Sequence, residues 1–540
     1  MTKTRILCRL LVCGLGGLPV DAAEPAAGFE GRIVDDATGA ALAARVAVTN
    51  IHGEFLETEG RHSHVEYLGK RWCYVAGSFA FEVPEDGAGL EIRRGLETLP
   101  EHWEVEPLAA GKPAARTFRL RRWVNLQRQG HVCGDIHAHQ PIPAEAVGQM
   151  EAEDLDALHL LHVADPYMAP AVNEEFTGAM DAHSRPGCEV RVGQEIRDWQ
   201  MGHLNLLGLT GLIPGYPDMG GTMEYWRTMP HWDLVRAMQA AREQQGTVVW
   251  AHIASLPGAQ LPVATALGLV DAVELITWHD PTQLPNHWSP WQNSGMSMAE
   301  FPVLRAVDLY YQFLNAGFHL PIAAGTDKFF EEIPLGSNRT YARVEGTADY
   351  AGWLAAIKAG RCFVSNGPIL EFSVEDHQPG EVVTLSGPQT VVARVRARSI
   401  LPFTTLEIVL NGAVVAHKTI AIPASEPIDG LYDMQIETSL ELTHSAWLAA
   451  RVVDHPDLPN RILPRDVAVF AHTSPVYFLR DGREVREPAS VAYLGKWVAG
   501  LLHWLESHPP FANESDRQNA RQTAEQALRY YRSPEGTRAQ

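Results

Sequence analysis

Apolar and polar positions alternate along the chain between residues 28 and 125. The stretch GFEGRIVDDATGAALAARVAVTN contains a strand-like run, a turn at DDATG, and then ARVAVTN with apolar residues at alternate positions. GSFAFEVPEDG and ARTFRLRR continue this period-two pattern, which is typical of strands with one buried face. No helical period of any length interrupts the pattern. We therefore predict a small β-sandwich over residues 24–125.

From about residue 130 to 365, short apolar runs alternate with longer segments of helical period. TMEYWRTMPHWDLVRAMQAAREQQG and FPVLRAVDLYYQFLNAG have helical periodicity, whereas TVVWAHIA, DAVELITWHD and HLPIAAGTD are strand-like. Strands that are apolar on both faces and alternate with helices indicate parallel βα units. Such a sheet closes into a barrel or stays open, and the pattern fits both. We assign residues 126–368 to this domain.

The rest of the chain returns to β periodicity and then becomes helical. LEFSVEDHQPGEVVTLSG, TVVARVRARS, TLEIVLNGAVVAHKTI and AWLAARVVD predict a second β-sandwich over residues 369–480, with a hairpin turn at Asn411-Gly412. EPASVAYLGKWVAGLLHWLESH and DRQNARQTAEQALRYYRS predict a helical tail over residues 481–540. We expect the apolar stripe of the tail to pack within the chain, as amphipathic helices usually do. Dimerisation through the tail is the alternative.

Length and charge limit the classes of function. A chain of 540 residues is too long for one ordinary domain, and 46% hydrophobic with 20% charged residues is an ordinary globular balance. The formal net charge is −21, and no basic stripe stands out. Nucleic acid is therefore not an expected partner. No segment after the N-terminus approaches the length of a transmembrane span.

The N-terminal sequence MTKTRILCRLLVCGLGGLPVDAAEP is similar to a secretory signal peptide. Lys3 and Arg5 precede an apolar run, and small residues at VDAA resemble a cleavage site. We expect residues 1–23 to be removed and the protein to be exported to the periplasm or the cell exterior. A buried N-terminal strand is the alternative, and Arg9 inside the apolar run is the main feature that departs from a signal peptide. Four cysteines then remain without a zinc-finger spacing, namely Cys73, Cys133, Cys188 and Cys362.

Residue types that bind metals stand at the ends of several apolar runs. The runs HVCGDIHAH, CEVRVGQE, TVVWAH and PIAAGTD close with such residues, and a further histidine opens GHLNLLGL. These residues are His137, His139, Glu195, His252, Asp327 and His203. Singly, each has an ordinary explanation as a core histidine or a turn residue. Ligands of parallel α/β sheets bind beyond the carboxyl ends of the strands, so together they predict a metal site. Nitrogen and oxygen donors suit zinc, manganese or iron.

With these motifs the chain resembles metallohydrolases of the PHP type (polymerase and histidinol phosphatase), and among them the CehA/McbA-like branch. The resemblance covers about residues 130–370 and rests on GDIHAH, GQEIRDWQMGHLNLLGL, VVWAHIASLPG, IAAGTDKF, GSNRTYARV and AIKAGRCFVSNGPIL. It implies a distorted (β/α) barrel with the metals at the carboxyl ends of the strands. The residues before 125 resemble a carboxypeptidase-regulatory-like sandwich, a common companion of such domains.

The resemblance also implies which residues bind which metal. The first metal would take His137, His139, Glu195 and Asp327. The second would take His203 and His252, with Glu195 bridging the two metals.

The chain departs from the family pattern at two positions. Asp165 is followed by Pro166 where the family has a histidine, and Asp327 is followed by Lys328-Phe329 in place of Asp-x-His. Both missing histidines bind the third metal in trinuclear members. We therefore predict two divalent ions and no third, with His162 as the residue that could substitute.

A two-metal site predicts hydrolysis, because a divalent ion lowers the pKa of a bound water to about 7. We expect attack on an ester, phosphoester, amide or carbamate bond of a small-molecule substrate. The candidate catalytic residues are Asp165 and Asp327, and the candidate substrate-binding residues are Arg339, His279 and Asn366. A catalytically degenerate extracellular binding protein is the alternative function, and a phosphatase slowed by loss of the third metal is another. The pattern determines neither the substrate nor the oligomeric state.

Overall fold

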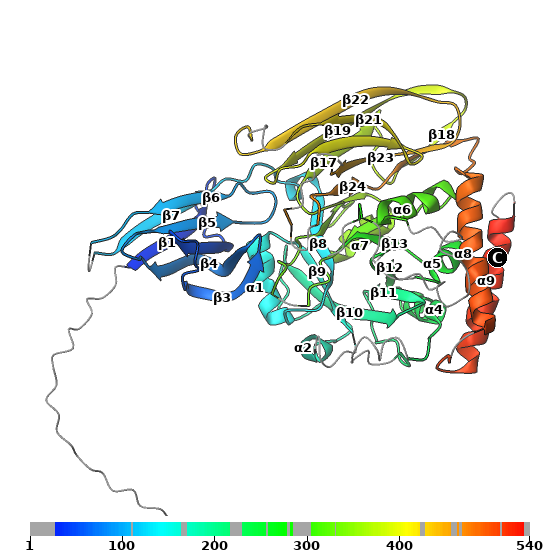
Figure 1. The fold of residues 1–540 in the computed structure, drawn as a ribbon, viewed down its shortest axis with the longest axis horizontal. Coiled ribbons are helices and arrows are strands. Elements are labelled where there is room, and N and C mark those ends of the chain that lie inside the picture. Colours follow the sequence, from blue (N-terminus) through cyan, green and yellow to red (C-terminus); the bar gives the residue numbers. More distant parts are fainter. Residues whose placement is uncertain are drawn as a thin grey trace, which may run out of the picture.

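The structure of this chain is a computed structural model with four parts that follow one another along the sequence (Figure 1). These are an N-terminal sheet, a barrel-like α/β part, a second β part and two final helices. The predicted signal peptide lies outside the described residues. The structure describes residues 28–109, 112–163, 170–216, 229–254, 258–277, 281–283, 304–329, 331–421, 427–454, 462–463, 467–507 and 510–533.

The first seven strands form one hydrogen-bonded sheet in the order β6-β5-β2-β4-β1-β7, with β3 paired to β4. Their bounds are Gly28–Asp35, Ala44–Asn50, Glu59–Tyr67, Lys70–Glu82, Ala88–Arg93, Glu101–Val105 and Ala114–Leu120. Alternate side chains, among them Phe29, Val46 and Phe79, form a separate hydrophobic core. The period-two pattern thus predicts the strands correctly. Continuous hydrogen bonding joins these strands into one sheet, and the predicted sandwich packing stays a prediction.

The next nine strands, β8 to β16, form the barrel-like part, in the order β14-β13-β12-β11-β10-β9-β8-β15-β16. β8, β9 and β10 pair in parallel, as do β12, β13 and β14, whereas β11 is antiparallel to both β10 and β12. β14 also packs against β8 and β16, so the sheet is nearly closed, in agreement with a barrel-like α/β domain. Their bounds are His131–Ala138, Ala157–His162, Glu189–Asp198, Gly202–Leu207, Thr247–Trp250, Ala272–Ile276, Ile322–Ala324, Arg339–Arg343 and Cys362–Ser365.

Helices pack outside this sheet. Among the described residues of the predicted helical segment, α4 begins at Leu234, because the Asp233 carboxylate accepts a hydrogen bond from the Val235 backbone N–H and caps the helix. Residues 217–228 lie outside the described part. A tightly buried core around Leu204, Trp250 and Phe313 joins the helices to the strands. The bounds of η1, α1, α2, α4, α5, α6 and α7 are Gln127–Gln129, Pro143–Glu153, Pro170–Asn173, Leu234–Glu243, Leu261–Ala266, Ala306–Asn315 and Tyr350–Lys358.

The second β part has two layers. β17, β19 and β22 form a three-stranded sheet, and the other strands continue the barrel sheet through a β16–β24 pairing. The predicted boundary at residue 368 therefore does not interrupt the hydrogen bonding. The predicted hairpin is confirmed, since Asn411 and Gly412 join β20 to β21 with φ of 48° and 87°. The bounds of β17 to β25 are Ile369–Val374, Val382–Leu385, Gln389–Ser399, Thr405–Leu410, Ala413–Thr419, Tyr432–Leu442, Ala446–Val453, Ala471–Thr473 and Val476–Arg480.

The two final helices, α8 (Pro488–Ser507) and α9 (Glu514–Arg532), pack against each other and against α5 and α6. Leu501 is fully buried in the core that they share with the barrel. The Tyr531 hydroxyl donates a hydrogen bond to the Pro262 carbonyl at 2.7 Å. The apolar stripe of the tail therefore packs within the chain, as predicted.

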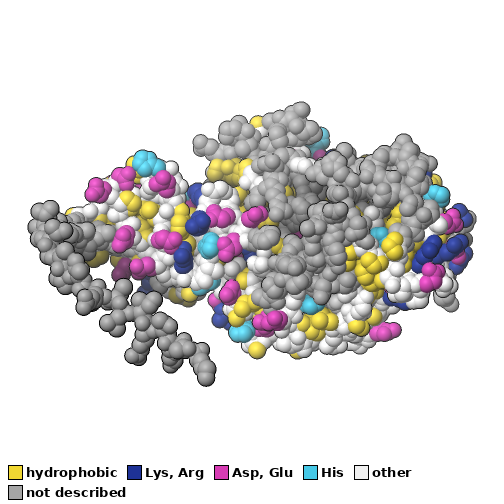
Figure 2. Space-filling view, turned by 60° about the horizontal axis from the view of Figure 1, so that its bottom comes forward, with side chains coloured by type: hydrophobic (Ala, Val, Ile, Leu, Met, Phe, Trp, Pro, Cys, Tyr) yellow, Lys and Arg dark blue, Asp and Glu magenta, His cyan; other side chains and the backbone are white. Residues whose placement is uncertain are grey.

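Charged groups on the surface are distributed unevenly. On the face drawn in Figure 2, acidic side chains are scattered over the N-terminal sheet, and basic side chains gather near the end where α8 and α9 lie. None of the described helices is long and apolar enough to cross a membrane. All cysteines in the described part of the chain are buried and free.

The packing of α8 predicts a difference between two neighbouring leucines. Leu501→Ala should lower the free energy of unfolding by about 2–5 kcal/mol, because it leaves a cavity in the shared core. Leu502 is only partly buried, so Leu502→Ala should cost clearly less. Urea unfolding followed by circular dichroism measures both. Equal losses would contradict the observed packing of α8.

Candidate metal centre

Four side chains at the carboxyl ends of β8, β10 and β14 converge on one point. His137 Nε2 lies 3.1 Å from His139 Nε2, 3.2 Å from Asp327 Oδ1 and 3.7 Å from Glu195 Oε2. His139 Nε2 lies 3.2 Å from Glu195 Oε2 and 3.3 Å from Asp327 Oδ1. All four side chains are buried. We call them the first group.

The spacing within the first group fits a divalent metal. Zinc ligands lie about 2.0–2.2 Å from the ion, so tetrahedral ligands lie about 3.3–3.6 Å from one another. The measured separations of 3.1 to 3.7 Å bracket this range. The donors are imidazole nitrogens and carboxylate oxygens, which suit zinc, manganese or iron. The first group therefore has the donor types and the spacing that such an ion requires.

A second group shares Glu195 with the first. Glu195 Oε1 lies 3.2 Å from His203 Nδ1 and 3.8 Å from His252 Nε2, and the two imidazole centroids are 4.8 Å apart. His203 comes close because β11 is antiparallel to β10 and pairs His203 with Arg197. The two oxygens of Glu195 thus face two different pairs of histidines. His137, His139 and Glu195 could hold one metal ion, and Glu195, His203 and His252 could hold another. Both sets were predicted from the sequence.

Two further contacts orient the histidines of the first group. His137 Nδ1 lies 3.1 Å from each oxygen of Glu274 in β13, and His139 Nδ1 lies 3.0 Å from the Leu161 carbonyl oxygen. Both acceptors require a proton on Nδ1, which directs the Nε2 lone pair of the neutral ring at the metal position. Glu274 was not among the residues predicted from the sequence. The available signal was a carboxylate inside the otherwise apolar run AVELI.

The backbone at two of the ligands has an uncommon conformation. His252 has φ of 30° and Asp327 has φ of 47°, values that residues other than glycine rarely adopt. Hydrogen bonds hold both in place: the His252 N–H donates to Glu274 Oε2 at 2.8 Å, and the Asp327 N–H donates to the His137 carbonyl at 2.7 Å. Asp135 accepts hydrogen bonds from the backbone N–H groups of His137 and Thr326, both at 3.0 Å. Strain of this kind concentrates at functional sites.

The buried charges set the protonation states of the ligands. Burial alone would raise the pKa of Glu195, but Arg197 and His137 outweigh it and hold that pKa well below the usual value. His137 likewise outweighs burial and holds the pKa of Asp327 well below its usual value. Burial lowers the pKa of His203 to about 4. Both carboxylates are therefore ionised and His203 is neutral at neutral pH, as metal binding requires.

His137 differs from His203. Burial would lower its pKa, but the carboxylates of Glu274, Asp327 and Glu195 raise it well above the usual value. A metal in the first group would therefore displace a proton from His137, so that metal binding would release protons.

Two predicted substrate-binding residues, Arg339 and Asn366, use their side chains to bind backbone groups. Arg339 is buried, and it donates from Nε to the Gly336 carbonyl at 2.6 Å and from Nη1 to the Glu153 carbonyl at 3.1 Å. Asn366 donates from Nδ2 to the Ala468 carbonyl at 3.0 Å and accepts from the Phe470 N–H at 2.7 Å. Both side chains hold the backbone together, so their contacts give the predicted substrate-binding role no support.

Three other candidate residues remain without a place in the site. Asp165 and His279 lie outside the described residues. His162, the predicted substitute for a third-metal ligand, ends β9 with its Nδ1 3.3 Å from the Asn173 carbonyl oxygen.

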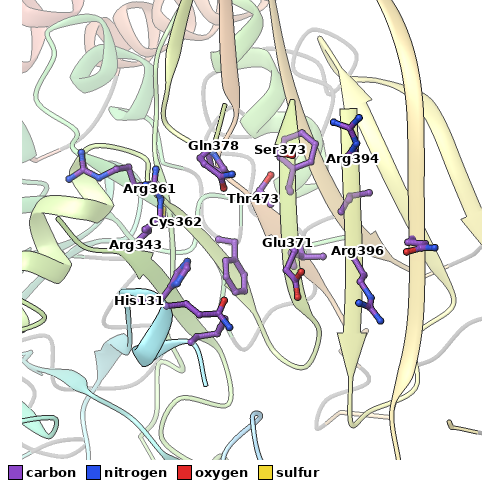
Figure 3. A pocket seen from close by; sticks show the side chains of 18 of the residues that line it. His131, Arg343, Arg361, Cys362, Glu371, Ser373, Gln378, Arg394, Arg396 and Thr473 are labelled. Atoms are coloured by element: carbon purple, nitrogen blue, oxygen red, sulfur yellow. The ribbon is translucent and has the colours of Figure 1, made fainter. Parts of the chain in front are cut away.

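A cavity of about 600 Å³ lies between the barrel and the three-stranded sheet (Figure 3). His131, which lines it, begins β8, so the cavity is at the opposite end of that strand from His137. Its arginines already pair with carboxylates, namely Arg343 with Glu381, Arg361 with Glu345, Arg394 with Glu437 and Arg396 with Asp433. The cavity is therefore separate from the metal groups, and neighbouring acidic residues neutralise its arginines.

No family model matches this chain, and no characterised protein or solved structure gives a significant match.

The close approach of β14 to β8 predicts the effect of one added methyl group. A Cβ at Gly325 would lie 2.4 Å from His137 Cβ and 2.8 Å from Glu274 Oε1. Gly325→Ala should therefore displace His137 from its contact with Glu274 and weaken zinc or manganese binding by about 10- to 100-fold. Equilibrium dialysis with elemental analysis measures the affinity. Gly387→Ala, where a Cβ meets nothing within 4 Å, is the control and should leave the affinity unchanged.

Proposed function

We propose that this chain is a metal-dependent hydrolase with two divalent ions that Glu195 bridges. The observation that carries the proposal is the placement of the Glu195 carboxylate, with Oε2 facing His137 and His139 and Oε1 facing His203 and His252. Zinc, manganese and iron suit this donor set. Bound there, the ions would lower the pKa of a water to about 7 and stabilise charge on the attacking and leaving oxygens.

The chain's own residues supply the remaining requirements. Glu274 and the Leu161 carbonyl orient the rings of His137 and His139. Both histidines are buried, so bulk water does not reach their ring nitrogens. We propose that Asp327, whose Oδ1 lies 3.2 Å from His137 Nε2, would hold the first ion and orient the attacking water. We propose Asp165 as an acid–base group.

The proposed reaction is hydrolysis of an ester, phosphoester, amide or carbamate bond in a small molecule. Ions of this type activate water against each of these bonds, so the metal groups alone do not select among them. The charge of the site is informative: two divalent ions held there, together with Arg197, would outweigh the negative charge of Glu195, Asp327 and Glu274. This balance is positive and favours a substrate that carries negative charge at the reacting centre.

A metal- or ligand-binding protein without turnover is the second candidate function. The observation that favours it is Arg197, whose guanidinium lies 2.5 Å from Glu195 Oε2 and already neutralises a carboxylate of the first group. Because the Arg197 guanidinium already occupies part of the first group, fewer metal ions would bind there. Fewer bound ions would activate water less.

Metal content tests the proposal directly. Protein purified without chelators should contain close to two ions per chain by elemental mass spectrometry. His137→Ala/His252→Ala removes one ligand from each group and should lose most of the metal and all metal-dependent turnover. His183→Ala/His377→Ala removes two histidines that contact Asp181 and Glu381 and belong to neither metal group. This control variant should retain both its metal content and its turnover.

Turnover is assayed with chromogenic phosphate, ester and amide substrates in the presence of Zn²⁺ or Mn²⁺. Metal binding without turnover on any of them would favour the binding protein. Equal metal content in the two double variants would contradict a metal site at these residues.

A further inference from the structure

Arg197 places a positive charge inside the first group. Its Nη2 lies 2.5 Å from Glu195 Oε2 and 3.2 Å from His139 Nε2, and its Nε lies 2.6 Å from the same oxygen of Glu195. Arg197 follows Glu195 by two residues in β10, so both side chains lie on the same face of the strand. The Arg197 side chain is only 4% exposed. The guanidinium is therefore a built part of the site.

The hydrogen bond between Arg197 and His139 leaves no room for a metal on the same atom. The His139 Nδ1 proton points to the Leu161 carbonyl, so Nε2 carries the one lone pair of the ring. A guanidinium has no acceptor and stays protonated, so Arg197 donates and His139 Nε2 accepts. His139 Nε2 can accept from Arg197 or bind a metal, but it cannot do both.

The Phe329 ring packs beside this hydrogen bond. It stacks on the His139 imidazole with centroids 4.0 Å apart and an angle of 17° between the planes. The Arg197 guanidinium carbon lies 4.9 Å from the centroid of the Phe329 ring, a favourable distance for a cation over an aromatic face. Phe329 thus contacts both partners of the Arg197–His139 hydrogen bond.

The contacts of Arg197 fall on one oxygen of Glu195. Arg197 Nε and Nη2 both contact Oε2, which faces the first group, whereas His203 and His252 face Oε1. A metal in the first group would bind Glu195 Oε2, the same oxygen that the Arg197 guanidinium contacts. A metal in the second group would bind the other oxygen. The two groups are therefore electrostatically unequal.

We infer that Arg197 competes with a metal ion for the first group, so that the two groups bind divalent ions with unequal affinity and the second group fills first. The inference rests on the proposed two-metal function and specifies the order in which that site is loaded. An ion in the first group must break the Arg197–His139 hydrogen bond and bind beside a fixed positive charge. We expect its affinity to be about 10- to 100-fold lower than that of the second group.

Metal titration tests the inference without any assay of activity. Metal-free protein is titrated with Co²⁺, followed by visible absorption and by equilibrium dialysis with elemental analysis. The unmodified chain should bind in two separate steps. Arg197→Met removes the charge and the donors but keeps an unbranched side chain, and it should tighten the weaker step by about 10- to 100-fold. Arg305→Met removes an exposed arginine paired with Asp308, and it should change neither step.

Two histidine variants identify the steps. His203→Ala should remove the tighter step, and His139→Ala should remove the weaker one. Circular dichroism establishes that each variant is folded. If Arg197→Met does not fold, the titration of the unmodified chain and of these two variants decides the order of loading.

The outcomes separate this inference from the proposed function. Two equal steps in the unmodified chain, a weaker step that Arg197→Met leaves unchanged, or a reversed order of loading would overturn the inference while the two-metal hydrolase stands. Absence of Co²⁺ binding in both the unmodified chain and Arg197→Met would overturn the proposed function itself.

Discussion

The burial of the Glu195 carboxylate is the constraint on which this end of the barrel depends. An ionised carboxylate removed from water is stable only when counter-charges and hydrogen-bond donors surround it. Here Arg197 comes from the same strand, and histidines come from β8, from β11 and from the second residue after β12. Removing one partner of a buried ion pair typically costs about 3–5 kcal/mol. The strands that meet here are therefore held in register by charge as well as by their apolar core.

The same end of the barrel shows how support and chemistry are divided between neighbouring residues. Asp135 and Glu274 bind backbone N–H groups or ring nitrogens, and so position the ligands without belonging to either metal group. Arg339 has a comparable structural role at the contact with the N-terminal sheet. It donates to the carbonyl of Glu153, whose carboxylate accepts hydrogen bonds from Arg45 and Tyr74 in that sheet. Arg339 is therefore part of the contact between the barrel and the N-terminal sheet.

Much of the candidate site was predictable because its ligands stand at a regular place in the pattern. The residues at the ends of apolar runs, such as His137, Glu195 and His252, come together because parallel strands end at the same edge of a sheet. Arg339 and Asn366 stand in equally suggestive motifs, but their side chains bind the backbone of other segments. Glu274 was missed because its partner, His137, is 137 positions away in the sequence.

The sequence by itself determined the strands and helices, the residue types at the strand ends, and the hairpin at Asn411-Gly412, because these depend on periodicity and local backbone preference. Only the tertiary structure decided that the barrel sheet continues through β24 into the second β part, and that Arg197 points its charge at His139. Hydrogen bonds and Coulomb interactions depend on distances between atoms, and residues far apart in the chain set those distances only when the sheet has closed around them.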